Sequence, residues 1–421
     1  MTKRIWALSL AFWMLCLFSS SAFARTLGPV SSYDELKTAV SSAQSGDTVL
    51  LSGEISAGND EPLSSAAFIH LKSETGAIVR GLHLQDAAFI LTGITLEDGL
   101  TVDGTSQISL SSGVTVSGAD SSTALTFSGK GALIVERGCE IKGGAGAAGI
   151  SIRHDGGEFY SSIEGRVTGG DGSSGGAGMI VSPLKEGGAV MITGTIQGGS
   201  GASVGGHALN LYDLSGNAYI TVGGTLQGGD GAIGGDGIQL VSASDNVSVG
   251  ISGQVKGGQG EFYGGNALIL MNAEGASSVN LSGHFSGGDV IGDDAQPGTS
   301  LNLVGDSTSL RARIDDCILE DGRRLHPAVS PLPVADAEAL PPLVGEPVPP
   351  NEATPSEAVD ESTPEAVDKT LESLPEVMPD PLPEIPTSSE AVDPADPASP
   401  DAISPVEATP SEATPGEAVP E

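Results

Sequence analysis

A pair of adjacent glycines returns along this chain at nearly constant intervals. The first glycines of successive pairs are 26, 29, 30, 29 and 30 residues apart. A repeat of this length predicts one structural unit stacked on copies of itself, because a single unit cannot bury its own apolar face. The sequence therefore predicts a solenoid. The pairs begin at Gly143, Gly169, Gly198, Gly228, Gly257 and Gly287.

Apolar residues keep fixed offsets from each glycine pair. They stand eight, six and two residues before it, as in Val190, Ile192 and Ile196. These offsets share one parity, which is the period of a β-strand with one buried face. After a second glycine pair in each repeat, apolar residues again alternate, as in Leu209 and Leu211. Each repeat therefore consists of short strands joined by glycine corners, which permit tight bends and close approach of the next coil.

Strands at matching positions in successive repeats predict an all-β chain that forms a parallel β-helix, with coils about 4.8 Å apart. We expect residues 47–327 to form this solenoid, with about ten coils. A left-handed hexapeptide helix has a much shorter repeat, and a β-propeller has about 40 or more residues per blade. Both alternatives fit the observed spacing less well.

The segment 25–46 precedes the first coil and contains a short helix. Residues 31–40 open with serine, a preferred N-cap residue, and continue with acidic residues and then an apolar stripe. Gly46 and Asp47 end the helix, and Thr48 begins the first strand. We expect this helix to cap one end of the solenoid.

A helix followed by the strand sequence GDTVLL and then by coils resembles the opening of right-handed parallel β-helix proteins of the pectate-lyase-like superfamily. The resemblance covers residues 30–325. It implies a right-handed solenoid whose open end is covered by the helix. Because that superfamily holds lyases, hydrolases and adhesins, the resemblance predicts the fold and leaves several functions open.

Both ends of the chain differ from the solenoid. Residues 1–24 contain two basic residues, an apolar run and Ala22-Phe23-Ala24, which predict a signal peptide cut before Arg25. A secreted or cell-surface protein is therefore expected. Residues 328–421 are rich in Pro, Glu, Ala and Thr and lack aromatic residues, which predicts a disordered acidic tail. No segment after the signal peptide is apolar and long enough to span a bilayer.

The chain carries a formal charge of −36, and the tail holds 21 of the 54 acidic residues. Nucleic acid is therefore excluded as a partner, because phosphate binding needs a basic surface. Polyanionic sugars would be repelled unless cations bridge them. Cys139 and Cys317 are expected about six coils apart, too far for a disulfide. Cys139 takes the place of a glycine at an inward bend of the later repeats.

Directly after the second glycine pair, successive repeats present His207, Asp236 and Asn266. Stacking places these residues on adjacent coils about 4.8 Å apart, within reach of a hydrogen bond or a shared ligand. This row is a candidate ligand site, and His207 with Asp236 is a candidate acid–base pair. The more ordinary interpretation is a structural ladder at a corner.

Three aspartates, Asp171, Asp230 and Asp289, share a position two residues after the first glycine of the pair. They fall on alternate coils, so about 9.6 Å would separate them, too far to share one calcium ion. The calcium-binding nonapeptide repeat also fails to match, because its aspartate is missing and its period differs. No cofactor is predicted, although calcium is the ion to consider.

A second candidate set lies near the end of the solenoid. Arg311, Arg313 and Asp315 alternate with apolar residues and share an outer face, and Asp316 follows them. Arginines beside carboxylates occur in β-helix lyases and galacturonases, where they meet uronates or perform acid–base chemistry. An ion-paired terminal coil explains the same residues without any activity.

Aromatic residues are few, and Phe262 and Tyr263 lie in a corner where other repeats carry small residues. This pair is therefore the one expected to be exposed and able to contact a sugar ring. Because site-like clusters are sparse, the sequence favours a secreted, non-enzymatic β-helix that binds an extracellular glycan or a surface protein. The alternative is a polysaccharide lyase or glycoside hydrolase of the pectate-lyase-like class.

Overall fold

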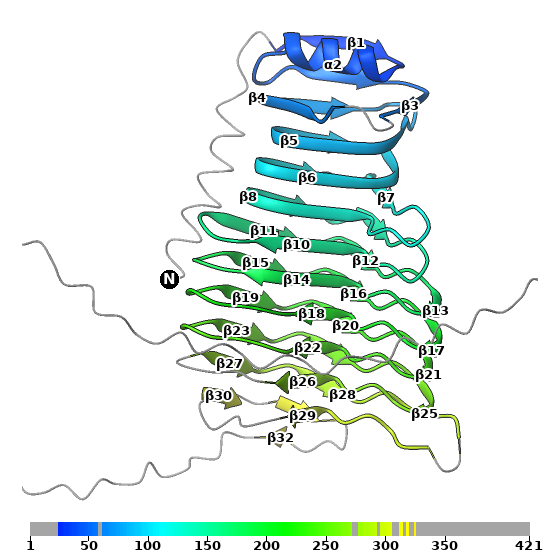
Figure 1. Cartoon of the computed structure of the whole chain (residues 1–421), viewed down its shortest axis with the longest axis vertical. Coiled ribbons are helices and arrows are strands. Elements are labelled where there is room, and N and C mark those ends of the chain that lie inside the picture. The colour runs from blue at the N-terminus through cyan, green and yellow to red at the C-terminus, as the bar shows by residue number, and fades with distance from the viewer. Residues whose placement is uncertain are drawn as a thin grey trace, which may run out of the picture. The chain divides into compact units, whose positions relative to one another are not determined.

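The computed structural model describes residues 24–57, 61–271, 277–292 and 295–304, together with three short strands at 311–314, 317–319 and 324–325. Of residues 303, 304 and these three strands, the backbone alone is described. The chain is a parallel β-solenoid in which successive turns stack along one axis (Figure 1). The predicted signal peptide up to residue 23 and the predicted tail at 328–421 lie outside the described residues.

The solenoid opens with β1 (Thr26–Val30), α2 (Tyr33–Ser42) and β2 (Thr48–Leu51). Ser32 caps the helix, because its hydroxyl accepts a hydrogen bond from the backbone N–H of Glu35 at 3.3 Å. The Glu35 carboxylate in turn accepts from the backbone N–H of Ser31 at 2.8 Å, which completes a reciprocal cap. The predicted helix is confirmed. Strand β1, which pairs in parallel with β2, was not predicted.

The early turns contain long strands that continue around the corners of the solenoid (Figure 1). Strands β5 and β6 are 15 and 16 residues long, and they pair in parallel along most of their length. Cα partners in these turns are close in sequence, as His70 with Ile90 and Ile90 with Ser109. The strands are β3 (Glu54–Ser56), β4 (Leu63–Lys72), β5 (Ile78–Thr92), β6 (Thr95–Leu110), β7 (Thr115–Ser117), β8 (Leu125–Val135) and β9 (Glu140–Lys142).

The later turns each contain three short core strands, and each strand pairs in parallel with its equivalent in the next turn. A last strand, β32 (Arg324–Leu325), runs antiparallel to β31. The first column is β10 (Ile150–His154), β14 (Met179–Leu184), β18 (Leu209–Leu211), β22 (Ile238–Leu240), β26 (Leu268–Met271) and β29 (Leu301–Val304). The second is β11 (Phe159–Ile163), β15 (Ala189–Ile192), β19 (Tyr219–Val222), β23 (Ser248–Ile251), β27 (Ser278–Leu281) and β30 (Arg311–Ile314). The third is β12 (Arg166–Thr168), β16 (Thr195–Gln197), β20 (Thr225–Gln227), β24 (Gln254–Lys256), β28 (His284–Ser286) and β31 (Cys317–Leu319).

The register of these columns is the one predicted from the glycine offsets. Val190 pairs with Ile220, which pairs with Val249, and all three side chains are buried in the core. Ile196 and Leu226 pair in the third column and are also buried. The apolar residues of one parity therefore form continuous inward rows, as a shared solenoid core requires.

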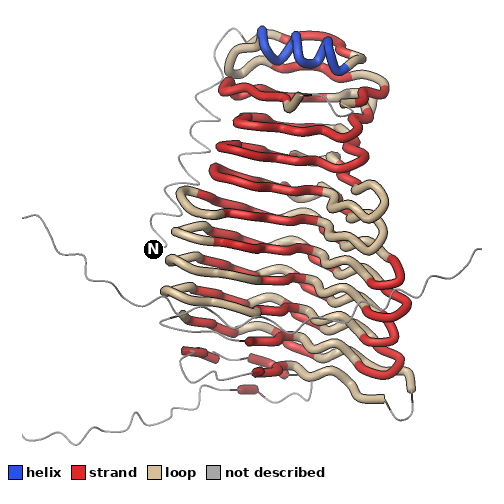
Figure 2. The backbone as a smooth tube through the Cα atoms, viewed as in Figure 1, coloured by secondary structure: helices blue, strands red, loops and turns tan. Residues whose placement is uncertain are grey.

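A second sheet projects from the later turns, and we call it the fin. It consists of β13 (Gly172–Ser174), β17 (Gly201–Val204), β21 (Gly231–Ile233) and β25 (Gly260–Tyr263), paired in parallel. Figure 2 shows these strands at one side of the turns, joined to the core by loops. Each fin strand lies between the two glycine pairs of its turn. The sequence had predicted only a corner at this place.

Two columns of glycines lie at the base of the fin, and each turn contributes to them the second glycine of each of its two pairs. The backbone N–H of Gly235 donates to the carbonyl oxygen of Gly229 in the same turn at 2.8 Å, and that of Gly258 donates to Gly235 in the preceding turn at 2.7 Å. The same pattern links the other turns, so the hydrogen bonds alternate between the two columns. A Cβ atom at Gly229 would overlap the carbonyl oxygen of Gly199. Only glycine allows the backbones to approach this closely.

Candidate functional site

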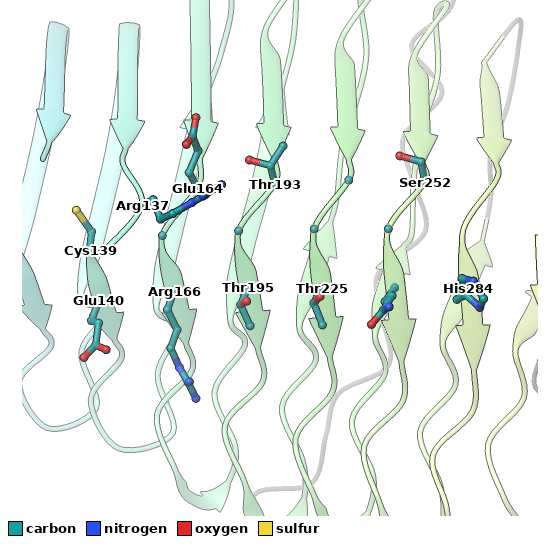
Figure 3. Close-up of a pocket in the computed structure, with 17 residues that line it drawn as sticks. Arg137, Cys139, Glu140, Glu164, Arg166, Thr193, Thr195, Thr225, Ser252 and His284 are labelled. Atoms are coloured by element: carbon teal, nitrogen blue, oxygen red, sulfur yellow. The ribbon is translucent and has the colours of Figure 1, made fainter. Parts of the chain in front are cut away.

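A shallow groove crosses the later turns at the corner between the second and third strand columns (Figure 3). It encloses about 670 Å³ and extends from the turn of Glu140 to the turn of His284. These residues are linked by successive register pairs on β9, β12, β16, β20, β24 and β28. Five strand spacings of about 4.8 Å give a length of about 24 Å.

The floor of the groove is formed by small residues at the bend between the two columns. Cys139 occupies the first of these positions, and glycine occupies the following four, all buried. A Cβ atom at Gly194 would overlap the carbonyl oxygen of Gly165 in the preceding turn, so the bend can approach its neighbour only without a side chain. The glycines at this bend therefore permit the close stacking of the turns beneath the groove.

The central walls carry neutral side chains that can donate and accept hydrogen bonds. One wall is the row of Thr195, Thr225 and Gln254, each at the start of its third-column strand and each exposed. The opposite wall carries Thr193 and Ser252, also exposed (Figure 3). Hydroxyl and amide groups of this kind pair with the hydroxyls of a polar ligand.

One end of the groove is charged. Arg137, Glu140, Glu164 and Arg166 gather there on adjacent turns (Figure 3). Within the described part of the chain, none of the four forms an ion pair within 4.0 Å, and Arg166 donates instead to the side-chain oxygen of Gln197 at 3.3 Å. This end therefore holds carboxylates and guanidinium groups that remain available to a ligand.

The Cys139 thiol lies beneath this end but is not a nucleophile for the groove. It is 1% exposed, and its Sγ donates toward the carbonyl oxygens of Leu110 and Ser111 at 3.1 Å each. Burial raises the pKa of this thiol to about 11, so it stays protonated at neutral pH. Its role is that of a small side chain at the bend, as its alignment with the glycines predicted. Cys317 is described only by its backbone.

The predicted row of His207, Asp236 and Asn266 is brought together by the structure. His207 Nδ1 lies 3.2 Å from Asp236 Oδ2, and it also lies 3.0 Å from the backbone N–H of Asp236. That N–H can donate to Nδ1 only when Nδ1 carries no proton. We favour this arrangement for the neutral ring, because it gives the otherwise unpaired N–H its partner. The proton of the neutral ring is then on Nε2.

Asp236 and Asn266 are held by internal hydrogen bonds. Asp236 Oδ1 accepts from both the backbone N–H and the side-chain amide of Asn266, at 2.8 and 3.0 Å. Asn266 Oδ1 then accepts from the backbone N–H of Thr299 at 3.1 Å. Each side chain thus caps the backbone of the next turn. An acid–base pair would need His207 Nδ1 to donate to the carboxylate, which the N–H of Asp236 opposes.

The aspartates of the other predicted row cap backbone groups in the same way. Asp171 Oδ1 accepts from the N–H of Ser200, and Asp230 Oδ1 accepts from the N–H of Gln259, both at 2.8 Å. The bond from Ser200 is the main reason why the pKa of Asp171 lies below its usual value. Among the described residues, no cluster of three or more His, Cys, Asp or Glu side chains could hold a metal ion.

The second predicted catalytic set is described only in part. Arg311 and Arg313 lie in β30, where the backbone alone is described, and Asp315 and Asp316 lie outside the described residues. Phe262 and Tyr263 lie in the fin and are 61% and 50% exposed. Tyr263 pairs in register with Ile233, which pairs with Val204, and both of these are also exposed. The fin therefore presents an apolar strip.

The groove itself was not predicted, although the sequence contained a signal for it. The residue three positions before each glycine pair forms one wall of the groove, and it is polar in all six repeats. The constant parity of the apolar residues marks the inward face, and the outward polar residues of the same strands carry no comparable periodic signal. The wall residues are Glu140, Arg166, Thr195, Thr225, Gln254 and His284.

The described part of the chain has no helix that is both long and apolar enough to cross a membrane. Comparisons with protein-family models, with curated proteins and with solved structures found no match. The chain is a parallel β-solenoid with a polar groove across its later turns.

Proposed function

We propose that this protein is a secreted, non-enzymatic binding module that holds an extended, hydroxyl-rich chain, a glycan, in the groove. The observation that carries the proposal is the row of neutral hydrogen-bonding side chains above the glycine floor. A repeating polar polymer can meet one such side chain per turn, and a long shallow groove leaves both ends of the polymer free. The acidic solenoid disfavours a polyanionic glycan, so we assign a neutral one.

Export to the cell exterior is the second part of the proposal. The predicted signal peptide at residues 1–24 supports export. The order of helix, strand and coils supports membership in the right-handed pectate-lyase-like class. The exposed pair Phe262 and Tyr263 offers a separate platform for a sugar ring or for a surface protein. His207, Asp236 and Asn266 are less suited to a ligand, because His207 Nδ1 and the Oδ1 atoms of Asp236 and Asn266 accept hydrogen bonds within the fold.

Isosteric removal of hydroxyl groups tests the groove. The double variant Thr195→Val and Thr225→Val keeps the shape of the wall and loses two hydrogen-bonding groups. At about 1 kcal/mol for each bond, affinity should fall by roughly 30-fold for any neutral glycan that an array identifies. Thr221→Val, on β19 outside the groove, is the matched control and should bind like the wild type. Equal affinity of the double variant and the control would exclude the groove as the binding site.

The charged end supports the alternative, a polysaccharide lyase or glycoside hydrolase. It is the one part of the groove where two carboxylates, Glu140 and Glu164, line the same hollow in the described residues. We expect no release of reducing ends or unsaturated sugars from pectin, alginate, xylan or glycosaminoglycans, with or without calcium. Turnover that disappears in Glu164→Gln would establish the enzyme and refute the binding module.

A further inference from the structure

The carboxylate of Asp47, between the capping helix and β2, is buried with 3% of its side chain exposed. Among the described residues, its hydrogen-bond donors belong to Arg25 and Gln44. The backbone N–H of Arg25 donates to Oδ1, with 2.8 Å between nitrogen and oxygen. The Arg25 guanidinium group donates to Oδ2 through Nε at 3.1 Å and through Nη2 at 2.7 Å. Gln44 supplies its backbone N–H at 2.9 Å. The first residue before β1 thus provides most of the partners of this buried charge.

Arg25 is held in place by its other backbone group as well. Its carbonyl oxygen accepts from the N–H of Thr48 at 2.8 Å, which begins the pairing of β1 with β2. Ala24, the residue before it, is exposed. Arg25 N is therefore fixed beside Asp47, while the peptide bond that joins it to Ala24 lies at the surface. This is the bond at which the sequence predicts removal of the signal peptide.

We propose that cleavage of the Ala24–Arg25 bond creates an α-ammonium group on Arg25 that pairs with Asp47 and locks the first turn of the solenoid. The cut consumes one water molecule, leaves a carboxylate on Ala24 and gives the Arg25 nitrogen the protons of an ammonium ion. A neutral amide donor that already lies 2.8 Å from a carboxylate thereby becomes a charged donor in the same place. The present bond already has an ionised acceptor, and the positive charge on the new donor adds a direct coulombic attraction to it.

The geometry distinguishes this bond from its neighbours. A cut after Arg25 would remove the guanidinium group and leave Asp47 with a single backbone partner from Gln44. A cut before Ala24 would leave a neutral amide at Arg25 and place the new charge in solvent. The Arg25 guanidinium, followed by the N–H groups of Gln44 and Arg25, lowers the pKa of Asp47 to about 2, so the carboxylate is ionised when the amine forms. Of these three cuts, the one between Ala24 and Arg25 places the new ammonium group beside the ionised carboxylate of Asp47 and keeps the guanidinium group.

Three versions of the chain, which differ only at the N-terminus, test the proposal. The first starts at Arg25 with a free amine, the second starts at Ala24, and the third starts at an N-acetylated Arg25; all continue to Glu421. The free-amine chain should melt about 2–4 °C above both others. The difference should persist in Arg25→Gln, which keeps the amine, and should vanish in Asp47→Asn. Equal melting temperatures in all three chains, or a difference that survives in Asp47→Asn, would overturn the clamp.

The cut itself rests on the proposed export, and mass spectrometry of the exported protein tests it separately. We expect Arg25 as the first residue. A different first residue would overturn the processing step, whatever the melting temperatures show. Neither measurement involves a glycan, so failure of the groove proposal would leave this result intact.

Discussion

The early and the later turns of this solenoid stack in different ways. In the early turns, Cα partners such as His70 and Ile90 are 20 residues apart, and the strands run through the corners. In the later turns, partners such as Val190 and Ile220 are 30 residues apart, and short strands alternate with glycine columns. The extra residues include the fin strands, whereas the bend beneath the groove has counterparts at Ile94 and Val114 in the early turns. The fin and the glycine columns are therefore features of the longer turns.

The two regions depend on different interactions. The early turns bury large side chains such as Phe89 and Phe127, both 0% exposed. The later turns rely more on backbone hydrogen bonds between glycines, which bring the chain close to itself without side chains. Substitutions should therefore be most damaging at large core residues in the first region and at glycines in the second.

The largest effect is expected from Phe127→Ala in the early turns. Phe127 is fully buried, and its ring lies 5.1 Å from that of Phe159. Loss of a buried aromatic ring should lower the free energy of unfolding by about 3–5 kcal/mol, measured by denaturant titration. Ile196→Val in the later turns is the smaller comparison and should cost about 0.5–1.5 kcal/mol. A loss below 1 kcal/mol in Phe127→Ala would show that packing does not dominate the early turns.

Gly229→Ala tests the glycine columns directly. The new Cβ would overlap a backbone oxygen, which cannot move aside as a side chain can, so we expect a loss of about 3 kcal/mol in the free energy of unfolding. Gly250→Ala is the matched control in β23, because its Cβ would meet nothing closer than 4.0 Å. If the two variants are equally stable, close packing of the glycine columns is not what holds the later turns together.

At the capping end, Asp47→Asn should destabilise the protein in a pH-dependent way. The pKa of Asp47 is about 2 in the fold and 3.8 as the reference value, so the ionised form stabilises the fold above about pH 4. This contribution is lost as the pH falls from about 4 to 2. The stability difference between wild type and Asp47→Asn, followed by thermal melts, should shrink over that window. A difference that stays constant from pH 7 to 2 would contradict the assignment.

The smallest effect is expected from Asp171→Asn, at the edge of the fin. The side chain is 57% exposed, so screening by water limits its contribution to about 0.2–1 kcal/mol at neutral pH. Because its pKa is lowered in the fold, the contribution should disappear as the pH falls through that pKa, below 3.8. Denaturant titration at pH 7 and pH 3 measures both values. A larger loss at pH 3 than at pH 7 would have the wrong sign.

The sequence predicted the stacked strands, their register and the capping helix, because each leaves a periodic or capping pattern. Val190, Ile220 and Val249 revealed their pairing through a constant offset from the glycines. The fin was missed because its strands carry few apolar residues and no alternation, as in Gly172–Ser174. Its hydrogen bonds come from the backbone, which has no residue signature.

The candidate site was harder to predict than the fold for a related reason. His207 and Asp236 were correctly placed side by side, but the sequence could not show that the backbone N–H of Asp236 occupies Nδ1. The groove depends on the empty volume above a bend, and a glycine at that position signals only that a side chain is absent. The threonines on its wall could equally well lie on any exposed strand, so they do not indicate a groove in the sequence. These cases differ only in how the turns pack in three dimensions.

The alternating hydrogen bonds between the glycine columns make each later turn a module that recognises only the turns on either side of it. A gene segment that encodes one such turn could be duplicated or lost in tandem without disturbing the ends, since every junction would present the same two backbones. Each copy would lengthen the groove by one rung of about 4.8 Å. The length of polymer that the groove can hold would thus change in steps of one whole turn.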